Sequence, residues 1–361
     1  MTCVNGVYNF SRTAFEQDIY QSIPLAEKRK LHLTLGRSLV ENLSQDELER
    51  HFYTVLLQFR CGLEAITSQS ERSAIAVLCL QATRVAVAAS DFEAACDYSD
   101  FGIMLLSAPN HWKEEYDLSL ALYNDAAEVF HLSANYKRVD ELITAVMENA
   151  QSYQDTLRVR STRVNSLSST NRLTEALDEG LDTLRHLGVR ISPKARMRHV
   201  SIEFLRTRRL LRGKTNEAVL RMPLMVDADK IAAMQMLNLL FPVAYRIDRV
   251  LFTLINLRLV RLTLQYGLSA ISTVGFAAYS VMLVTLYRDK EEGFRYSQLA
   301  LDLLDKFDAR EYISRTYFFV YAEAYTFKYE IRHLCPYLQK ACELGLQSGD
   351  VQYALYNSTL L

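Results

Sequence analysis

The sequence is poor in the residues that interrupt helices: its 361 residues include only 12 Gly and 6 Pro. This supply of turn formers is too small for a β-rich protein of this length. Several prolines stand where a helix would begin or end, as Pro24, Pro193 and Pro223 do. Half of the residues are hydrophobic, which is enough for a continuous core. The expected fold class is therefore all-α.

Signatures of catalytic and metal sites are also missing. The six cysteines form no CxxC pair, and none of the seven histidines lies three or four residues from another His or from a Cys, so zinc is not expected. No GxSxG, HExxH or kinase loop occurs. We expect no catalytic residue, cofactor or metal in this chain. The unpaired cysteines and the lack of a secretory leader favour a reducing, cytoplasmic location.

Charges are absent from one long stretch, residues 262–287, which could cross a bilayer by length alone. Gln265, Gly267 and Ser269 interrupt it. The favoured interpretation is a turn near residues 266–269 between two buried helices, and no membrane span is expected.

A short junction recurs between amphipathic runs. Its four copies are Ser90–Ala95, Ala134–Val139, Asn171–Ala176 and, more weakly, Arg288–Gly293. The third positions of the first three copies are 44 and 37 residues apart. This period predicts a right-handed α-α solenoid of tetratricopeptide-like helix hairpins over residues 46–361. The sequence stops inside a predicted helix without a polar cap, and we expect a truncated C-terminus.

Residues 1–45 differ from the repeats and predict a small helical remnant. Phe15, Ile19 and Ile23 share a helical face that ends at Pro24. A second helix is expected over Leu25–Leu43. Its predicted apolar face is Leu31, Leu35, Leu39 and Leu43.

Several loose motifs resemble those of large multidomain signal-transduction ATPases of the STAND class. The resemblance begins with an F-x4-F-EQ-x-x-Y-x-x-IP pattern (Phe10–Pro24) and covers nearly all of the chain. The further segments that carry it are Leu31–Leu39, Leu184–Val189, Leu211–Gly213, Met222–Met225 with Asp227, and Leu257–Gly267. One departure is Arg12-Thr13, where the family usually has a His-Asp pair.

In that family a kinase-like domain and the ATPase precede a tetratricopeptide-like helical region, and a sensor and a histidine kinase follow it. The resemblance therefore implies that this chain corresponds to the helical region, with the ATPase and kinase modules absent. Gly213-Lys214-Thr215 does not restore a phosphate loop, because Arg208 stands where the motif needs its first glycine and the preceding residues predict a helix.

Residues 185–221 form the strongest charge feature, with eleven Lys or Arg against Glu203 and Glu217. Three interpretations remain open: a solvated helix face, a surface for an acidic protein partner, or a surface for nucleic acid or anionic lipid. Nucleic acid is the less favoured partner, because Phe204 is the only aromatic residue among the arginines. Arg206, Arg208 and Arg209 are the candidate contacts.

Aromatic residues supply the other candidate contacts. Trp112, the single tryptophan, is expected either to pack at a helix start or to contact a partner. The helix expected over residues 312–329 holds too many aromatic rings to face one core. Tyr317, Tyr321 and Tyr325 are its candidate contacts, with packing as the alternative.

These observations lead to one functional hypothesis and its rivals. The chain is expected to be a non-catalytic protein-interaction and regulatory segment of an ATPase-linked signalling kinase, whose partner is another protein or a neighbouring ATPase or kinase module. The alternatives are a nucleic-acid-binding repeat protein that uses residues 185–221, a stand-alone helical adaptor, and an enzyme with scattered catalytic residues.

Overall fold

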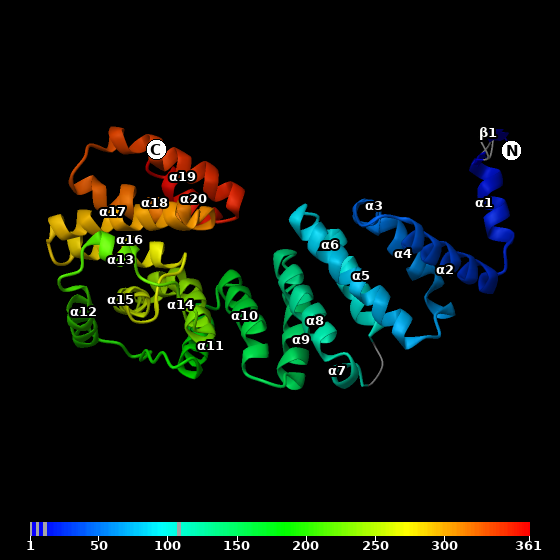
Figure 1. The fold of residues 1–361 in the computed structure, drawn as a ribbon, viewed down its shortest axis with the longest axis horizontal. Helices are drawn as coiled ribbons and strands as arrows, with labels where there is room; N and C mark the ends of the chain where they lie inside the picture. The colour runs from blue at the N-terminus through cyan, green and yellow to red at the C-terminus, as the bar shows by residue number, and fades with distance from the viewer. Residues whose placement is uncertain (1, 5–6, 10–12, 107–109) are drawn as a thin grey trace. The chain divides into compact units, whose positions relative to one another are not determined.

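The computed structural model describes residues 2–4, 7–9, 13–106 and 110–361, and helices dominate them (Figure 1). The predicted all-α class is confirmed. The chain divides into two compact units, Met1–Thr162 and Arg163–Leu361. The predicted division into residues 1–45 and 46–361 stays a prediction.

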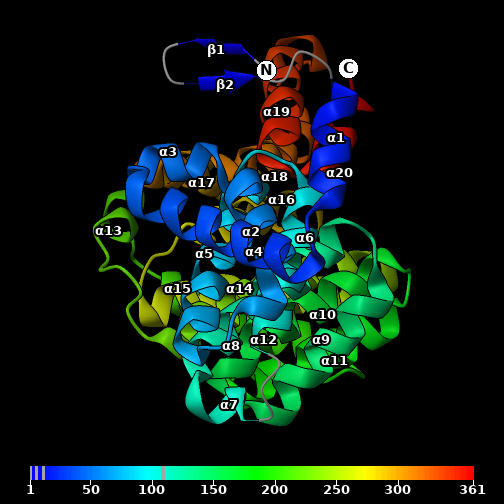
Figure 2. The same ribbon diagram turned by 90° about the vertical axis from the view of Figure 1, so that its right-hand side faces the viewer.

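The first unit contains two strands, nine α-helices and the start of a tenth among its described residues. Their bounds are β1 (Thr2–Val4), β2 (Val7–Asn9), α1 (Thr13–Ser22), α2 (Leu25–Asn42), α3 (Gln45–Arg50), α4 (Phe52–Gly62), α5 (Gln69–Ala88), α6 (Phe92–Leu105), α7 (His111–Glu114), α8 (Tyr116–Leu132), α9 (Tyr136–Asn149) and α10 (Leu157–Ser169). The strands pair antiparallel, with Thr2 opposite Asn9 (Figure 2). Phe10 and Arg12, on which part of the resemblance rests, lie outside the described residues.

The second unit continues with helices. Their bounds are α11 (Leu173–His186), α12 (Met197–Leu211), α13 (Asn216–Leu220), α14 (Ala228–Ile247), α15 (Arg249–Tyr266), α16 (Ser272–Thr285), α17 (Lys290–Phe307), α18 (Ile313–Tyr317), α19 (Ile331–Ser348) and α20 (Val351–Ser358). A π-helix over Phe318–Ala324 follows α18. The helix expected over residues 312–329 is thus a series of short helical segments.

The four predicted junctions share one backbone geometry. Their first residues all have a left-handed φ of 57–61°: Ser90, Ala134, Asn171 and Arg288. At the first junction the Ser90 N–H donates to the Val87 carbonyl and the Asp91 N–H to the Ala86 carbonyl, each at 2.9 Å, which is the Schellman pattern of a helix end. The Asp91 side chain then caps the next helix by accepting the Ala94 N–H at 3.1 Å. One helix ends at Ala88 and the next begins at Phe92, so three residues make the junction.

The apolar face predicted for α2 is partly wrong. Leu31 and Leu35 are 46% and 44% exposed, whereas Leu33 and Gly36 are buried. Gly36 faces the Phe59 ring of α4, so closely that a Cβ there would lie 3.1 Å from it. The contact with α4 therefore sets the rotation of α2, and the four-residue spacing of the leucines does not.

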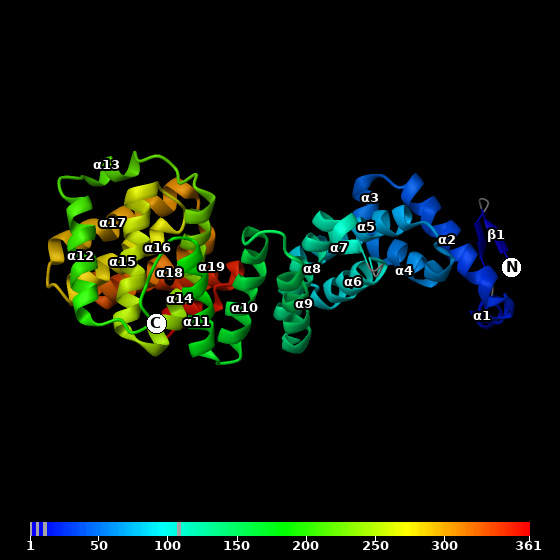
Figure 3. The same ribbon diagram turned by 90° about the horizontal axis from the view of Figure 1, so that it is seen from below.

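Helix α16 is the centre of the second unit. Twelve of its 14 residues are buried, and α15, α17 and α18 pack around it (Figure 3). The predicted turn before it is confirmed, since α15 ends at Tyr266 and Gly267 has a φ of 113°. A Cβ on Gly267 would lie 2.6 Å from the Pro223 carbonyl oxygen, so this position requires glycine. In the described part of the chain, no helix has both the length and the hydropathy that a bilayer span requires.

Candidate functional site

Helix α12 carries the centre of the basic segment and separates its charges by face. Its buried residues are Val200, Glu203, Phe204, Thr207 and Leu211. The arginines Arg206, Arg208 and Arg209 are exposed. The basic segment is therefore an amphipathic helix whose apolar face anchors it to the second unit, and the cations are presented to solvent or to a ligand.

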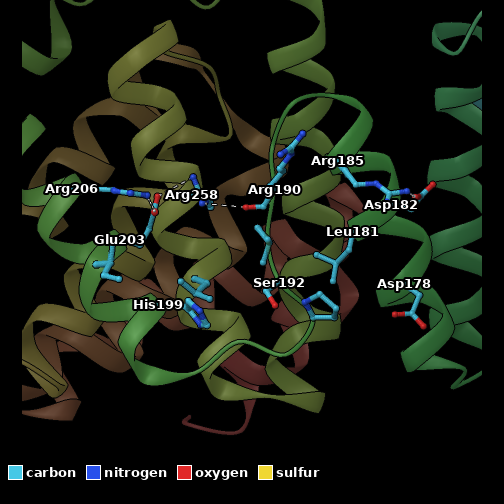
Figure 4. Close-up of a pocket in the computed structure, with 14 residues that line it drawn as sticks. Asp178, Leu181, Asp182, Arg185, Arg190, Ser192, His199, Glu203, Arg206 and Arg258 are labelled. Atoms are coloured by element: carbon cyan, nitrogen blue, oxygen red, sulfur yellow. Dashed lines mark hydrogen bonds and ion pairs between the residues drawn. The ribbon is translucent and has the colours of Figure 1, made fainter.

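A pocket of about 680 Å³ opens beside α12. It lies between α11, the loop of residues 188–196, the first half of α12 and α15 (Figure 4). Its lining residues are Asp178, Leu181, Asp182, Arg185, Arg190, Ile191, Ser192, Pro193, His199, Ile202, Glu203, Arg206, Leu254 and Arg258. Charged and apolar side chains alternate around it, which suits a polar segment of a partner better than an apolar ligand.

The buried carboxylate of Glu203 organises this pocket. Its side chain is 3% exposed and lies 2.9 Å from an Arg261 nitrogen and 3.3 Å from an Arg258 nitrogen. Arg206 is farther away, at 3.7 Å. Burial raises the pKa of Glu203, while the charges of Arg261 and Arg206 lower it. Because the arginines surround the carboxylate, it binds α12 to α15 as an ion pair.

Arg258 also fixes the loop at the rim of the pocket. Its guanidinium donates to the Arg190 carbonyl at 3.2 Å (Figure 4). Among the described residues, the Arg190 side chain makes no hydrogen bond or ion pair, whereas Arg185 pairs with Asp182. The pocket thus presents one exposed and unpaired guanidinium on a backbone that Arg258 holds in place.

The charged side chains of the pocket can bind an ionic group of a ligand. Ser192 and His199 both line the pocket, but no hydrogen bond joins them in the described structure, where the His199 Nδ1 accepts the Arg196 N–H at 2.9 Å. No group of three or more His, Cys, Asp or Glu side chains that could hold a metal occurs within the described ranges.

The structure distributes the seven candidate contacts over four places. Arg206 lines the pocket at Glu203, and Arg208 and Arg209 line a different pocket beside the second half of α12. Trp112 belongs to the first unit, where it packs against the core of α8 and α9, with its ring centroid 4.9 Å from that of Tyr123. The predicted packing of Trp112 is observed, and its contact with a partner stays a prediction.

The three tyrosines lie together around the π-helix. Tyr321 lies 4.9 Å from Tyr317 and 5.5 Å from Tyr325 between ring centroids. Tyr337 of α19 stacks on Tyr321 at 4.2 Å, with nearly parallel planes. Tyr321 is only 8% exposed, so most of its ring packs inside the unit. Tyr317 and Tyr325 are half-buried and keep an edge that a partner could reach.

Sequence reasoning missed the most important members of the pocket. Glu203 entered it only as a charge that offsets arginines. Arg258 and Arg261 were absent from it, although two arginines three residues apart in an otherwise apolar helix could have indicated a buried ionic partner.

The first unit holds a smaller groove, of about 360 Å³, on helices α5, α8 and α10. Its residues are Thr83, Arg84, Val87, Asp125, Glu128, Val129, Leu132 and Arg158. The buried carboxylate of Asp125 lies 2.7 Å from Arg84 and 2.8 Å from Arg158. Leu132 is 51% exposed at its edge. Helices α5, α8 and α10 are therefore joined by the ion pairs of Asp125, and the exposed Leu132 lies at the edge of the groove.

Comparison with protein-family models gives no match for this chain. Among curated proteins, the chain is 18% identical over 341 residues to the hybrid signal transduction histidine kinase G of Dictyostelium discoideum. The match covers 83% of this chain and 10% of that protein, so the chain spans about a tenth of the length of this relative. This distant similarity indicates a signalling context.

Proposed function

We propose that this chain is a non-catalytic, tetratricopeptide-like interaction and regulatory segment of a larger signalling kinase. The observation that carries the proposal is the similarity to a hybrid signal transduction histidine kinase over 83% of the chain. The left-handed turn that recurs at Ser90, Ala134 and Asn171 supports the repeat assignment, because repeated units should have equal turns. Stacked repeats build the extended surfaces that such proteins use for binding. The STAND-type ATPase context rests on the sequence resemblance.

The groove of the first unit is the proposed docking surface for a partner segment or a neighbouring module. The buried Asp125 carboxylate pairs with both Arg84 and Arg158 and so holds the two guanidinium groups in place. No buried charge is left unpaired at this point of the groove. The exposed Leu132 adds an apolar contact, and a few such anchors supply most of the affinity of an interface. Regulation would follow if the partner bound one nucleotide state of the kinase more tightly than the other.

The test begins with proximity labelling of the endogenous protein, followed by affinity measurement with the purified partner. Leu132→Glu should weaken binding by about tenfold or more, since it places a charge in an apolar contact. Leu31→Glu is the matched control, because Leu31 is similarly exposed but lies on α2, away from the groove. Equal affinity for the wild type and Leu132→Glu would remove the groove from the proposal.

The link to a larger kinase is tested separately by the mass of the endogenous protein. An antibody against residues 193–214 should detect a protein far heavier than 41.4 kDa, the mass of this chain. A mass near that value would replace the kinase context with the stand-alone adaptor.

A further inference from the structure

A second pocket, of about 690 Å³, lies beside the C-terminal half of α12. The elements around it are α12, the turn that leads to α13, α16 and α17, and Figure 3 shows α12, α13 and α17 at the same end of the second unit. Its lining residues are Leu205, Arg208, Arg209, Leu211, Arg212, Gly213, Lys214, Thr215, Tyr279, Leu283, Asp289, Glu292, Arg295 and Tyr296. Five cations therefore face two carboxylates.

Both carboxylates already have partners inside the protein. Glu292 forms two hydrogen bonds with Arg295, each at 2.8 Å. Asp289 caps α17 by accepting the Glu292 N–H at 3.3 Å. Glu292 is therefore paired with Arg295, and the remaining charge of Asp289 can offset at most one of the four cations of α12 and its following turn.

The other four cations have no internal partner. In the described structure, no hydrogen bond or ion pair involves the side chain of Arg208, Arg209, Arg212 or Lys214. A helix C-terminus stabilises one or two nearby cations, but it does not account for four of them around a single cavity. Four like charges around one cavity repel one another, so the arrangement favours a bound polyanion.

Tyr279 provides a second and independent observation. It is only 1% exposed, lines the pocket, and its hydroxyl makes no hydrogen bond to any described residue. Burial raises the pKa of Tyr279, so the hydroxyl keeps its proton and can donate it to a ligand oxygen. The hydroxyl oxygen itself remains accessible to solvent at the pocket, so an acceptor oxygen of a ligand can reach it.

We infer that this pocket binds a small molecule that carries two or more linked phosphate groups. Guanidinium groups match phosphate oxygens in pairs, and four unpaired cations balance the charge of a di- or triphosphate better than that of a single phosphate. The volume is that of a small-molecule site. Leu205, Leu283 and the Tyr279 ring form an apolar wall for the remainder of such a ligand.

The contacts in this site come from side chains and differ from those of a phosphate loop. Gly213 and Lys214 lie in the turn that follows α12, and Thr215 caps α13 by accepting the Ala218 N–H at 3.2 Å. The Gly213-Lys214-Thr215 sequence thus places its lysine at the pocket without a strand and loop before it. The inference is independent of the proposed kinase context.

The test is calorimetric titration of the full chain with inorganic triphosphate at about 150 mM NaCl, where screening suppresses distant surface charges. We expect saturable 1:1 binding. Arg208→Gln combined with Arg212→Gln should weaken it by about tenfold or more for each guanidinium removed. Arg198→Gln is the matched control, because Arg198 is exposed on the same helix and lines neither pocket. Its affinity should equal that of the wild type.

Tyr279→Phe removes the hydroxyl and keeps the packing of the ring. It should therefore lower the affinity for triphosphate and leave the stability of the fold unchanged. Absence of binding, or an equal loss of affinity in Arg198→Gln, would overturn the inference. Two further titrations identify rival ligands. An acidic hexapeptide that binds more tightly than triphosphate would replace it with a protein segment. A single-stranded oligonucleotide whose affinity falls equally in all the arginine variants would show a general basic surface for nucleic acid.

Discussion

The two compact units hold their helices together by different means. In the first unit, surface ion pairs such as Arg37 with Glu71 and Arg138 with Asp100 connect helices that are close in sequence. In the second unit, the almost fully buried α16 forms the centre, and contacts join distant segments, as when Asn216 donates to the Arg295 carbonyl 79 residues away.

The difference shows where each unit places its charges. The ion pairs of the first unit are mostly exposed and each contributes little, whereas Glu203 in the second unit is held between two arginines that are themselves only 17% and 19% exposed. A buried ionic centre is costly to assemble and costly to break. The second unit should therefore be more sensitive to the loss of Glu203 than the first unit is to the loss of a partner in an exposed pair such as Arg37 with Glu71.

The largest effect is expected from Glu203→Ala. Removal of the carboxylate leaves Arg258 and Arg261 with unpaired charges, so the unfolding free energy of the second unit should fall by about 3–5 kcal/mol. Circular dichroism of the full chain measures this decrease. Trp112 is the single tryptophan and belongs to the first unit, so its fluorescence follows that unit alone.

Glu71→Ala in the first unit is the control, with an expected decrease of at most about 1 kcal/mol because its partner Arg37 is half exposed. If both variants are destabilised by similar amounts, or if Trp112 fluorescence moves with Glu203→Ala as far as the circular dichroism does, the contrast between the units fails.

The fold elements that could be predicted are those that depend on neighbouring residues. The junction at Ser90 and Asp91 combines a helix end with a helix cap, and both are local patterns. The turn between α15 and α16, inside the uncharged residues 262–287, was also predictable, because Gly267 and its polar neighbours indicated it. The rotation of α2 was not predictable, since the ring of Phe59 that receives Gly36 lies on another helix.

The candidate sites were less predictable for the same reason. The basic character of residues 185–221 was evident, but its division into a buried Glu203 and two separate pockets depends on α15, α16 and α17. Tyr321 was a candidate contact on composition alone, and the ring that covers it, Tyr337, comes from a later helix. No local pattern could have joined those two rings.

A smaller effect tests the repeated turn of the first unit. Ala134 has a φ of 57°, a conformation that costs a residue with a Cβ about 1–2 kcal/mol. Ala134→Gly should therefore raise the unfolding free energy by about 0.5–1 kcal/mol, measured by urea unfolding with Trp112 fluorescence. Ala145→Gly, in the middle of α9, should instead lower it by about 1 kcal/mol. If both changes destabilise the protein equally, the left-handed turn is not what limits this hairpin.

The smallest effect concerns pH and one link of the first unit. The Tyr116 hydroxyl donates to the Asp155 carboxylate at 2.6 Å, and the Ser152 N–H donates to the same oxygen at 2.9 Å. These hydrogen bonds, the one from Tyr116 first, lower the pKa of Asp155. A carboxyl whose folded pKa is depressed stabilises the fold above its unfolded pKa of about 3.9 and loses that contribution as the pH falls through the folded value.

The midpoint of unfolding followed by Trp112 fluorescence should therefore decrease as the pH is lowered below about 4, and Tyr116→Phe should make this decrease shallower. Asp117→Asn, which removes an exposed carboxylate one residue away, should leave the slope as in the wild type. Trp112 reports this transition because it belongs to the same unit, with its ring 6.2 Å from that of Tyr116. An unchanged slope in Tyr116→Phe would mean that the acid sensitivity of the first unit comes from its exposed ion pairs instead.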